Sequence, residues 1–464
     1  MSSNRLFGLS AAKDKLLKDL SSRRQGRDGG ASGGRLADAD VMVPMPRFEE
    51  LPGYRQMKQQ KVMADTLGIP NPFFRVHQGA SGATALIGNR EYINFSSYNY
   101  LDLAGHPHVA ERTKAAVDQY GTSASASRVV SGEKTIHREL ETAIAGIYEA
   151  EDCVVMVSGH ATNVSVIGHM FGPKDLVLHD ALIHNSAVQG AQLSGSRRIA
   201  FPHNDWEALE KILKAERRAH EKAVILLEGH YSMDGDLPDL ARFVEVKNRW
   251  GAWLMVDEAH SLGVLGETGH GIFEAQGIAP GDIDIWMGTL SKTLSGCGGY
   301  ICGSAALIEY LKFSAPGFVY SVGMSPPVAG AALGSLEMMK AEPWRVSQLN
   351  KQSARFRDGA AARGFDVGPS VGAAIVPIIT GSSIKAARLA AELYERGINV
   401  QPILYPAVPE KSARLRFFLS CAHTDAQIDQ TLEALTESWA AVQAAGNTVK
   451  ELAARLGMVL GDDN

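Results

Sequence analysis

The chain contains few cysteines, which argues against a fold held together by disulfides or by cysteine-ligated metals. The 464 residues contain four cysteines, Cys153, Cys297, Cys302 and Cys421, which form neither a CxxC pair nor a metal-ligand spacing. The sequence therefore predicts reduced thiols, a cytoplasmic location and no metal site.

Long apolar runs and an excess of one charge are also missing. No apolar run approaches the roughly 20 residues that a membrane span requires, and the N-terminus lacks the apolar core of a secretory signal. The net charge of -5 gives no reason to expect nucleic-acid binding. The chain is 45% hydrophobic and 21% charged, and these proportions are ordinary for a soluble globular enzyme.

The length predicts more than one folded unit, because 464 residues exceed an average domain. We expect an N-terminal extension (1–47), an N-terminal segment (48–105), a large domain (106–345) and a small C-terminal domain (346–464). In the extension, "AAKDKLLKDL" predicts a short amphipathic helix, and "SSRRQGRDGGASGGRLADAD" predicts a flexible linker. The tail "TVKELAARLGMVL" predicts another helix.

Short apolar runs separated by amphipathic segments predict an α/β fold with a mostly parallel sheet. The runs are "DCVVMVSG", "DLVLHD", "AVILLEGH", "WLMVDEAH" and "IWMGTLSK", and helical patterns such as "DWEALEKILKAERRAHEK" lie between them. Fully buried parallel strands have this character, and functional residues lie at their carboxyl ends. The later runs "AAIVPIIT", "INVQPILY" and "RLRFFLSC" predict a smaller α+β unit.

The polar residues at these strand ends suit a pyridoxal-phosphate (PLP) site. A lysine forms a Schiff base with an aldehyde, which makes Lys292 the candidate for holding the cofactor. The carboxylate of Asp257 would keep the pyridine nitrogen protonated. The phosphate needs backbone N–H donors at a helix start, which Gly159 and His160 offer. Further candidates are the hydroxyls of Thr289 and Ser291 for the phosphate and the ring of His184 above the cofactor.

Each of these motifs has a simpler interpretation when taken alone. An Asp-x-x-His at a strand end, as in "VDEAH", is more often structural or metal-related. A Ser-Lys pair is weaker evidence because most lysines are solvated, and "SGHATN" is an ordinary capped helix start. The order and spacing of the motifs together favour the PLP site.

Several longer motifs occur in an order that resembles the α-oxoamine synthases, which are fold-type I PLP-dependent transferases. The motifs are "NFSSYNYLDL", "GTSASASRVVSGEKTIHRELE", "SGHATN", "HDALIHNS", "EGHYSMDGDLPDL", "VDEAHSLGVLGETGHG", "GTLSKTLSGCGGY" and "RLRFFLSCAHT". The family includes serine palmitoyltransferase and 8-amino-7-oxononanoate synthase. The resemblance implies an α/β fold with a large, mostly parallel-sheet domain and a smaller C-terminal α+β domain, PLP as cofactor, and a homodimer.

The resemblance also assigns roles to matching positions. Lys292 is similar to the lysine that holds PLP, and Asp257 to the partner of the pyridine nitrogen. The other matches are His184 stacked on the ring, His260 and Ser232 beside the phenolic oxygen, Gly159, His160 and Thr289 at the phosphate, and Arg416 at the carboxylate of the amino acid. Arg414, two residues away on the same strand face, is the alternative to Arg416, which the family spacing favours.

Three departures from the family pattern affect particular assignments. Relatives read Asn-Asp-Tyr-Leu where this chain has "YNYL", so that either Asn99 or Tyr98 faces the substrate. His160 stands where an aromatic residue is usual, although a backbone contact would survive this change. Relatives use a Ser or Thr before the Pro pair to reach the neighbouring subunit's phosphate. Here Ser321 is the candidate, with Val322 as an obstacle.

The reaction implied by the resemblance is a decarboxylative Claisen condensation of an amino acid with an acyl thioester, which gives an α-amino ketone in lipid or sphingolipid biosynthesis. The sequence does not choose between serine, glycine and alanine, or between acyl-CoA and an acyl carrier protein. The basic "RRQGR" would suit an acidic carrier protein but is also typical of a solvated linker. The alternatives are another fold-type I PLP enzyme, such as an aminotransferase or lyase, and a non-catalytic partner subunit, which would be expected to lack Lys292.

Overall fold

The computed structural model describes residues 45–444. Residues 45–63 belong to one compact unit and residues 64–444 to a second. The described chain begins with the 3-10 turn η1 (Phe48–Glu50) and helix α2 (Pro52–Thr66). The helix and linker predicted for residues 11–40, and the tail helix predicted for residues 448–460, lie outside the described residues.

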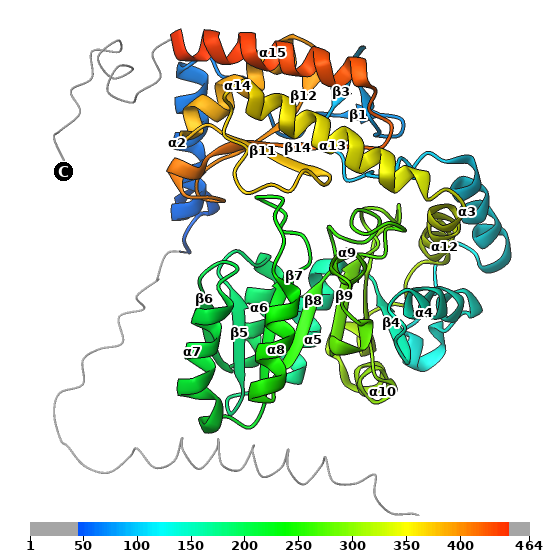
Figure 1. Ribbon diagram of the computed structural model, residues 1–464. Coiled ribbons are helices and arrows are strands. Elements are labelled where there is room, and N and C mark those ends of the chain that lie inside the picture. The colour runs from blue at the N-terminus through cyan, green and yellow to red at the C-terminus, as the bar shows by residue number, and fades with distance from the viewer. Residues whose placement is uncertain (1–44, 445–464) are drawn as a thin grey trace, which may run out of the picture. The chain divides into compact units, whose positions relative to one another are not determined.

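A seven-stranded sheet is the largest sheet of the second unit (Figure 1). Its strands, in spatial order, are β4 (Asp152–Met156), β10 (Gly299–Gly303), β9 (Ile285–Thr289), β8 (Trp253–Asp257), β7 (Ala223–Glu228), β5 (Leu176–Asp180) and β6 (Arg197–Phe201). Strand β10 is antiparallel to β4 and β9, and the other neighbours are parallel. The predicted mostly parallel sheet is thus confirmed. Strand β6 has no apolar run to predict it, because it is an edge strand with exposed arginines.

Both faces of this sheet are buried. Val155 and Val256 lie in one hydrophobic cluster, whereas their strand neighbours Val154 and Met255 lie in another. Parallel strands covered on both sides therefore appear in the sequence as continuous apolar runs. Helices α4 (Thr135–Ile147), α7 (Trp206–Glu216), α8 (Leu240–Trp250) and α9 (Ile272–Gln276) contribute to the first cluster. Helices α5 (Gly159–Met170), α6 (Asn185–Ser194), α10 (Ala305–Ser314) and α11 (Pro316–Val319) contribute to the second.

Two smaller sheets complete the second unit. One is antiparallel, with the order β11 (Ile375–Ile379), β14 (Arg414–Phe418), β13 (Gln401–Ile403). The other has the order β1 (His77–Gln78), β2 (Thr84–Ile87), β3 (Arg90–Asn94), β12 (Ile398–Asn399). Because β3 pairs with β12, chain segments that precede and follow the large sheet share one sheet. The predicted domain boundaries stay a prediction.

The remaining helices connect or cover these sheets. They are α3 (Pro107–Tyr120), α12 (Pro326–Ala341), α13 (Trp344–Ala362), α14 (Ser383–Glu395) and α15 (Asp425–Ala444). Single turns occur at η2 (Arg128–Gly132), η3 (Arg217–Ala219), η4 (Pro280–Asp282) and η5 (Glu410–Ser412). Among residues 45–444, no helix has both the length and the hydropathy needed to cross a membrane, and no cluster of three or more His, Cys, Asp or Glu residues could hold a metal ion.

Candidate active site

A cavity of ≈ 250 Å³ lies at the carboxyl ends of the parallel strands and contains most of the residues that the sequence singles out. The predicted residues that line it are Gly159, His160, His184, Ser232, Asp257, His260, Thr289, Lys292 and Arg416. Tyr98, Asn163, Ser186, Glu228, Met233, Ala259 and Met287 also line it. Residues more than 300 positions apart in the sequence thus meet at one place.

Asp257 is the last residue of β8, and its carboxylate is held by two donors. The side-chain amide of Asn163 donates to Oδ2 at 2.9 Å, and the backbone N–H of Ala259 donates to Oδ1 at 3.0 Å. Asn163 also donates to the hydroxyl of Ser186 at 3.0 Å, which fixes the amide. Sequence reasoning did not single out Asn163, although it ends the motif "SGHATN" one turn after Gly159.

Lys292 follows strand β9 and lines the cavity opposite an aromatic ring. Its Nζ lies 5.6 Å from the centre of the Tyr98 ring. Burial, assisted by the charge of Arg416, lowers the pKa of Lys292 to about 8, although Asp257 and Glu228 oppose the shift. A substantial fraction of the amine is therefore neutral near pH 8, and the neutral amine is the form that attacks an aldehyde.

His184 is the N-cap of helix α6, and this position fixes its ring. The ring Nδ1 lies 2.7 Å from the hydroxyl of Ser186 and accepts the backbone N–H of Ser186 at 3.3 Å. Burial lowers the pKa of His184, which favours the neutral imidazole that can accept at Nδ1. A capped helix start thus presents a flat, neutral ring to the cavity.

His260 is oriented by a tyrosine from far along the sequence. Its Nδ1 lies 2.7 Å from the hydroxyl of Tyr100, and both side chains are buried. Burial, with Lys292 as the next cause, holds the pKa of His260 well below its usual value. When the Tyr100 hydroxyl donates to Nδ1, Nε2 carries the ring proton. Sequence reasoning did not identify Tyr100, because its partner lies 160 positions away.

The start of helix α5 suits a phosphate group. The N–H groups of Gly159 and His160 belong to the first helical residues, which lack intrahelical partners. A Cβ atom at Gly159 would lie 2.8 Å from the Thr289 hydroxyl, so only glycine leaves room for this close approach. Backbone donors and a hydroxyl at a helix start, a carboxylate, a partly neutral lysine and a neutral imidazole together fit PLP.

The two arginines of β14 have different surroundings. Arg416 lines the cavity, its Nη1 donates to the carbonyl of Ser232 at 3.0 Å, and its buried Nε has no partner among residues 45–444. Arg414 instead forms an ion pair with Asp234 and donates to the carbonyl of Met233 at 3.0 Å. The structure therefore places Arg416, rather than Arg414, where a ligand carboxylate could meet it.

Three predicted residues lie outside the cavity lining. The amide oxygen of Asn99 accepts the N–H groups of Leu103 and Ala104 at 2.8 and 3.1 Å, whereas the neighbouring Tyr98 lines the cavity. Ser291 accepts a hydrogen bond from Thr289 at 3.1 Å. Ser321 lies in the loop before α12.

The loop that follows β7 and carries Ser232 is anchored by a charged histidine. His203 lies 2.8 Å from both Asp180 Oδ1 and Asp236 Oδ2. Burial alone would lower the pKa of His203, but the hydrogen bonds to Asp180 and Asp236 and their negative charges raise this pKa to about 10. His203 is therefore an imidazolium at neutral pH, clamped between the end of β5 and the loop.

We expect His203→Gln to lower the free energy of unfolding in a pH-dependent way. Because the pKa of His203 in the folded state lies above the ordinary histidine value of 6.5, the ionic contribution is fully present below pH 6.5 and is lost as the pH rises through about 10. The loss should be about 1.5–3 kcal/mol at the acidic end of this window, as for hydrogen bonds to charged groups. Urea unfolding of both proteins across the window measures it. A difference that is equally large at both ends would contradict the ionic interpretation.

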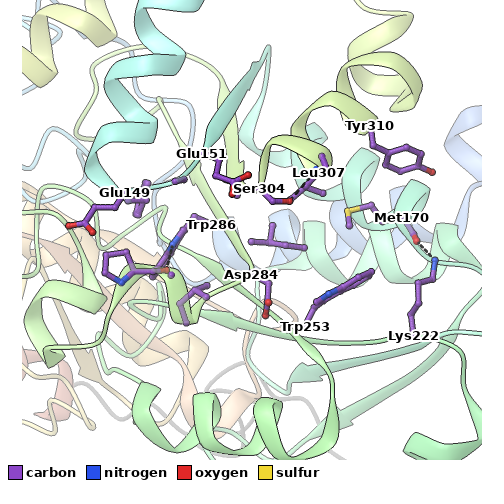
Figure 2. A pocket seen from close by; sticks show the side chains of 18 residues that line it. Glu149, Glu151, Met170, Lys222, Trp253, Asp284, Trp286, Ser304, Leu307 and Tyr310 are labelled. Carbon is purple, nitrogen blue, oxygen red and sulfur yellow. Dashed lines mark hydrogen bonds between the residues drawn. The ribbon is translucent and has the colours of Figure 1, made fainter.

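A second cavity lies at the amino ends of strands β8 and β9, and Figure 2 shows the side chains that line it. It measures ≈ 680 Å³ and includes Trp253 at the start of β8. Two of the charged side chains that line it have partners within the protein: Lys222 donates to the carbonyl of Met170 at 2.8 Å, and Asp284 pairs with Lys247 at 3.0 Å. None of the predicted site residues lines this cavity.

The chain is similar to known enzymes over most of its length. The family model for aminotransferase class I and II matches residues 90–435. A putative 8-amino-7-oxononanoate synthase from Gloeobacter violaceus is 40% identical over 363 residues, which cover 78% of this chain and 92% of the relative. The 8-amino-7-oxononanoate synthase of Pseudomonas aeruginosa is 38% identical over 380 residues, which cover 82% of this chain and 93% of the relative.

Solved structures give the same result. Serine palmitoyltransferase from Sphingomonas wittichii superposes with a TM-score of 0.80 at 29% identity, covering 84% of this chain and 98% of the other. A serine palmitoyltransferase variant from S. paucimobilis, solved with bound PLP and myriocin, has a TM-score of 0.81 at 28% identity and the same coverage.

Proposed function

Since the chain belongs to the aminotransferase class I and II family, and within it to the α-oxoamine synthases, we propose that its cavity binds serine, glycine or alanine together with an acyl group carried by CoA or by a carrier protein. The protein is a PLP-dependent acyltransferase that condenses an amino acid with an acyl thioester and releases carbon dioxide. The observation that carries the proposal is the meeting of Lys292, Asp257, His184 and Arg416 in one cavity.

Some residues of the cavity bind the cofactor and the amino acid, and Lys292 transfers a proton. PLP, when bound, supplies an electron sink for the bond that breaks at the α-carbon. Asp257 provides the negative charge for the pyridine nitrogen, and the Gly159 end of helix α5 binds the phosphate. Arg416 binds the carboxylate of the amino acid, and Lys292, with its pKa of about 8, takes and returns the proton at Nζ.

A product assay tests this function. The purified protein, supplied with PLP, is incubated with serine, glycine or alanine and with one acyl chain presented either on CoA or on a carrier protein. We expect carbon dioxide and an α-amino ketone from at least one combination. Transamination without consumption of acyl thioester would instead support an aminotransferase, and no turnover with any combination would support a non-catalytic subunit.

Arg416→Ala should weaken amino-acid binding far more than PLP binding. A shielded, charge-assisted pair is worth about 1.5–3 kcal/mol, or roughly a 10- to 150-fold change in Kd. Spectral titration of the PLP-loaded protein with each amino acid measures the change. Arg414→Ala is the matched control, since its partner Asp234 belongs to the protein. A binding defect in Arg414→Ala but not in Arg416→Ala would reverse the assignment.

We further propose a cytoplasmic homodimer in which Ser321 reaches the neighbour's phosphate site. The loops "GTSASAS" and "YSVGMSPP" lie side by side, because Gly323 N donates to the carbonyl of Ala126 at 2.9 Å and Ser325 donates to the carbonyl of Thr122 at 2.7 Å. Tyr320, the first residue of the second loop, is 86% exposed, and Val130, shortly after the first loop, is 78% exposed. Exposed apolar side chains on ordered loops favour contact with a second chain.

Sedimentation at micromolar protein, with cofactor absorbance followed in the same run, tests the homodimer. We expect the absorbance to travel with a dimer, and Tyr320→Asp to give monomers that lose PLP. A stable monomer that keeps both its cofactor and its activity would overturn this proposal.

A further inference from the structure

A second carboxyl group lies in the cavity beside Asp257. Glu228 is the last residue of β7 and is paired in register with Asp257 at the end of β8. It lines the same cavity, and only 4% of it is exposed. Neighbouring strands are about 4.8 Å apart, and paired residues of parallel strands face the same side of the sheet. The two carboxyl groups are therefore immediate neighbours.

The two oxygens of Glu228 differ in their contacts. The backbone N–H of Ser232 donates to Oε2 at 3.2 Å, whereas the buried Oε1 has no hydrogen-bond partner among residues 45–444. Asp257, by contrast, accepts one hydrogen bond at each oxygen. Two adjacent buried carboxylates repel each other, and the one with fewer donors keeps its proton.

The ionisation of Glu228 agrees with this geometry. Burial, followed by the negative charge of Asp257, raises the pKa of Glu228 to about 8, although Lys292 and the backbone N–H groups of Ser232 and His184 oppose the shift. Because the N–H of Ser232 occupies Oε2, the proton of the neutral acid resides on Oε1. A protonated carboxyl is a hydrogen-bond donor, which a carboxylate cannot be.

We propose that Glu228 is a further ligand-contacting residue, whose protonated Oε1 donates a hydrogen bond to an acceptor atom of the ligand bound against Asp257. This inference rests on the proposed function. The two residues at the paired strand ends then contact different parts of the ligand. The ionised Asp257 faces a positive part, and the neutral Glu228 faces a hydrogen-bond acceptor. Adjacent acids held in different protonation states are a recurrent arrangement of enzyme active sites.

The chain offers a matched control in Glu258. This residue follows Asp257 directly, is also fully buried, and burial raises its pKa to about 8 as well. It does not line the cavity. Its oxygens instead face the backbone N–H of Ile272 at 3.3 and 3.4 Å. Glu258 is thus a protonated buried acid that a ligand in the cavity cannot reach.

Infrared difference spectroscopy of the purified protein, before and after addition of PLP, tests the assignment. The carbonyl stretch of a protonated carboxyl is resolved from that of a carboxylate. We expect PLP to shift one such band in the unmodified protein and in Glu258→Gln, and to shift none in Glu228→Gln. Circular dichroism checks the fold of each variant. If Glu228→Gln does not fold, a band shift that is missing from Glu258→Gln with PLP attached still overturns the assignment.

A shift that persists in Glu228→Gln, or that is missing from Glu258→Gln although PLP is attached, overturns the assignment. Borohydride reduction followed by peptide mass spectrometry reports the attachment of PLP to Lys292 separately from the infrared band. If PLP does not attach to Lys292 in the unmodified protein, the proposed function fails first and this inference fails with it.

Discussion

Replacing Lys292 with alanine should abolish covalent attachment of PLP and lower turnover by roughly 10²–10⁴-fold or more. Of the described residues that line the cavity, Lys292 is the one primary amine, and its lowered pKa of about 8 makes it reactive near neutral pH. Borohydride reduction, proteolysis and mass spectrometry of the peptide that contains residue 292 measure the attachment. Turnover is followed by release of carbon dioxide.

The Lys222→Ala variant is the appropriate control for Lys292→Ala. Lys222 also lines a cavity, but one at the amino ends of β8 and β9, where it donates to the carbonyl of Met170 (Figure 2). We expect unchanged stoichiometry of reduced PLP in this variant. Unchanged stoichiometry in Lys292→Ala would instead show that another amine holds the cofactor.

Asp257→Asn should preserve the fold and reduce turnover by about 10²–10³-fold, the scale on which one preorganised electrostatic group contributes to catalysis. Asparagine has nearly the same shape as aspartate, but it carries no charge to keep the pyridine nitrogen protonated. Circular dichroism and steady-state kinetics of the PLP-loaded protein measure the two effects. Turnover within a few-fold of the parent would remove Asp257 from this role.

The same variant has a consequence that does not depend on turnover. Asp257 raises the pKa of Lys292, so removing its charge should move that pKa further below about 8. The rate of PLP attachment to the apo-protein as a function of pH reports the neutral fraction of the amine. Its midpoint should move to lower pH in Asp257→Asn, and a midpoint that moves upward would contradict the proximity of these two groups.

The sequence could predict the large sheet and the residues at its strand ends, because both depend on local patterns. An apolar run followed by polar residues marks the end of a buried parallel strand, and Asp257, at the end of β8, follows this rule. Strand β10 could not be predicted in the same way, because its antiparallel pairing with β4 and β9 is a matter of tertiary contact.

The residues that orient the site were largely missed, for a different reason. Asn163 and Tyr100 act through partners 94 and 160 positions away, and no local pattern records such distances. Strand geometry alone could not choose between Arg414 and Arg416, because both lie on one face of β14, although the family spacing favoured Arg416. In the structure the loop after β7 distinguishes them, since Asp234 pairs with Arg414 whereas Arg416 lines the cavity.

The contacts between the loop after β7 and strand β14 restrict how the substrate preference of the enzyme could be redesigned. Arg414 binds Asp234, and Arg416 binds the carbonyl of Ser232 and lies 3.4 Å from the sulfur of Met233. Loop and strand therefore take up their positions together. A library that varies Met233 alone would alter the shape of the cavity and disturb Arg416 at the same time. Varying the loop and β14 jointly, with Arg414 and Asp234 kept constant, would let the preference for one amino acid over another change while the carboxylate contact survives.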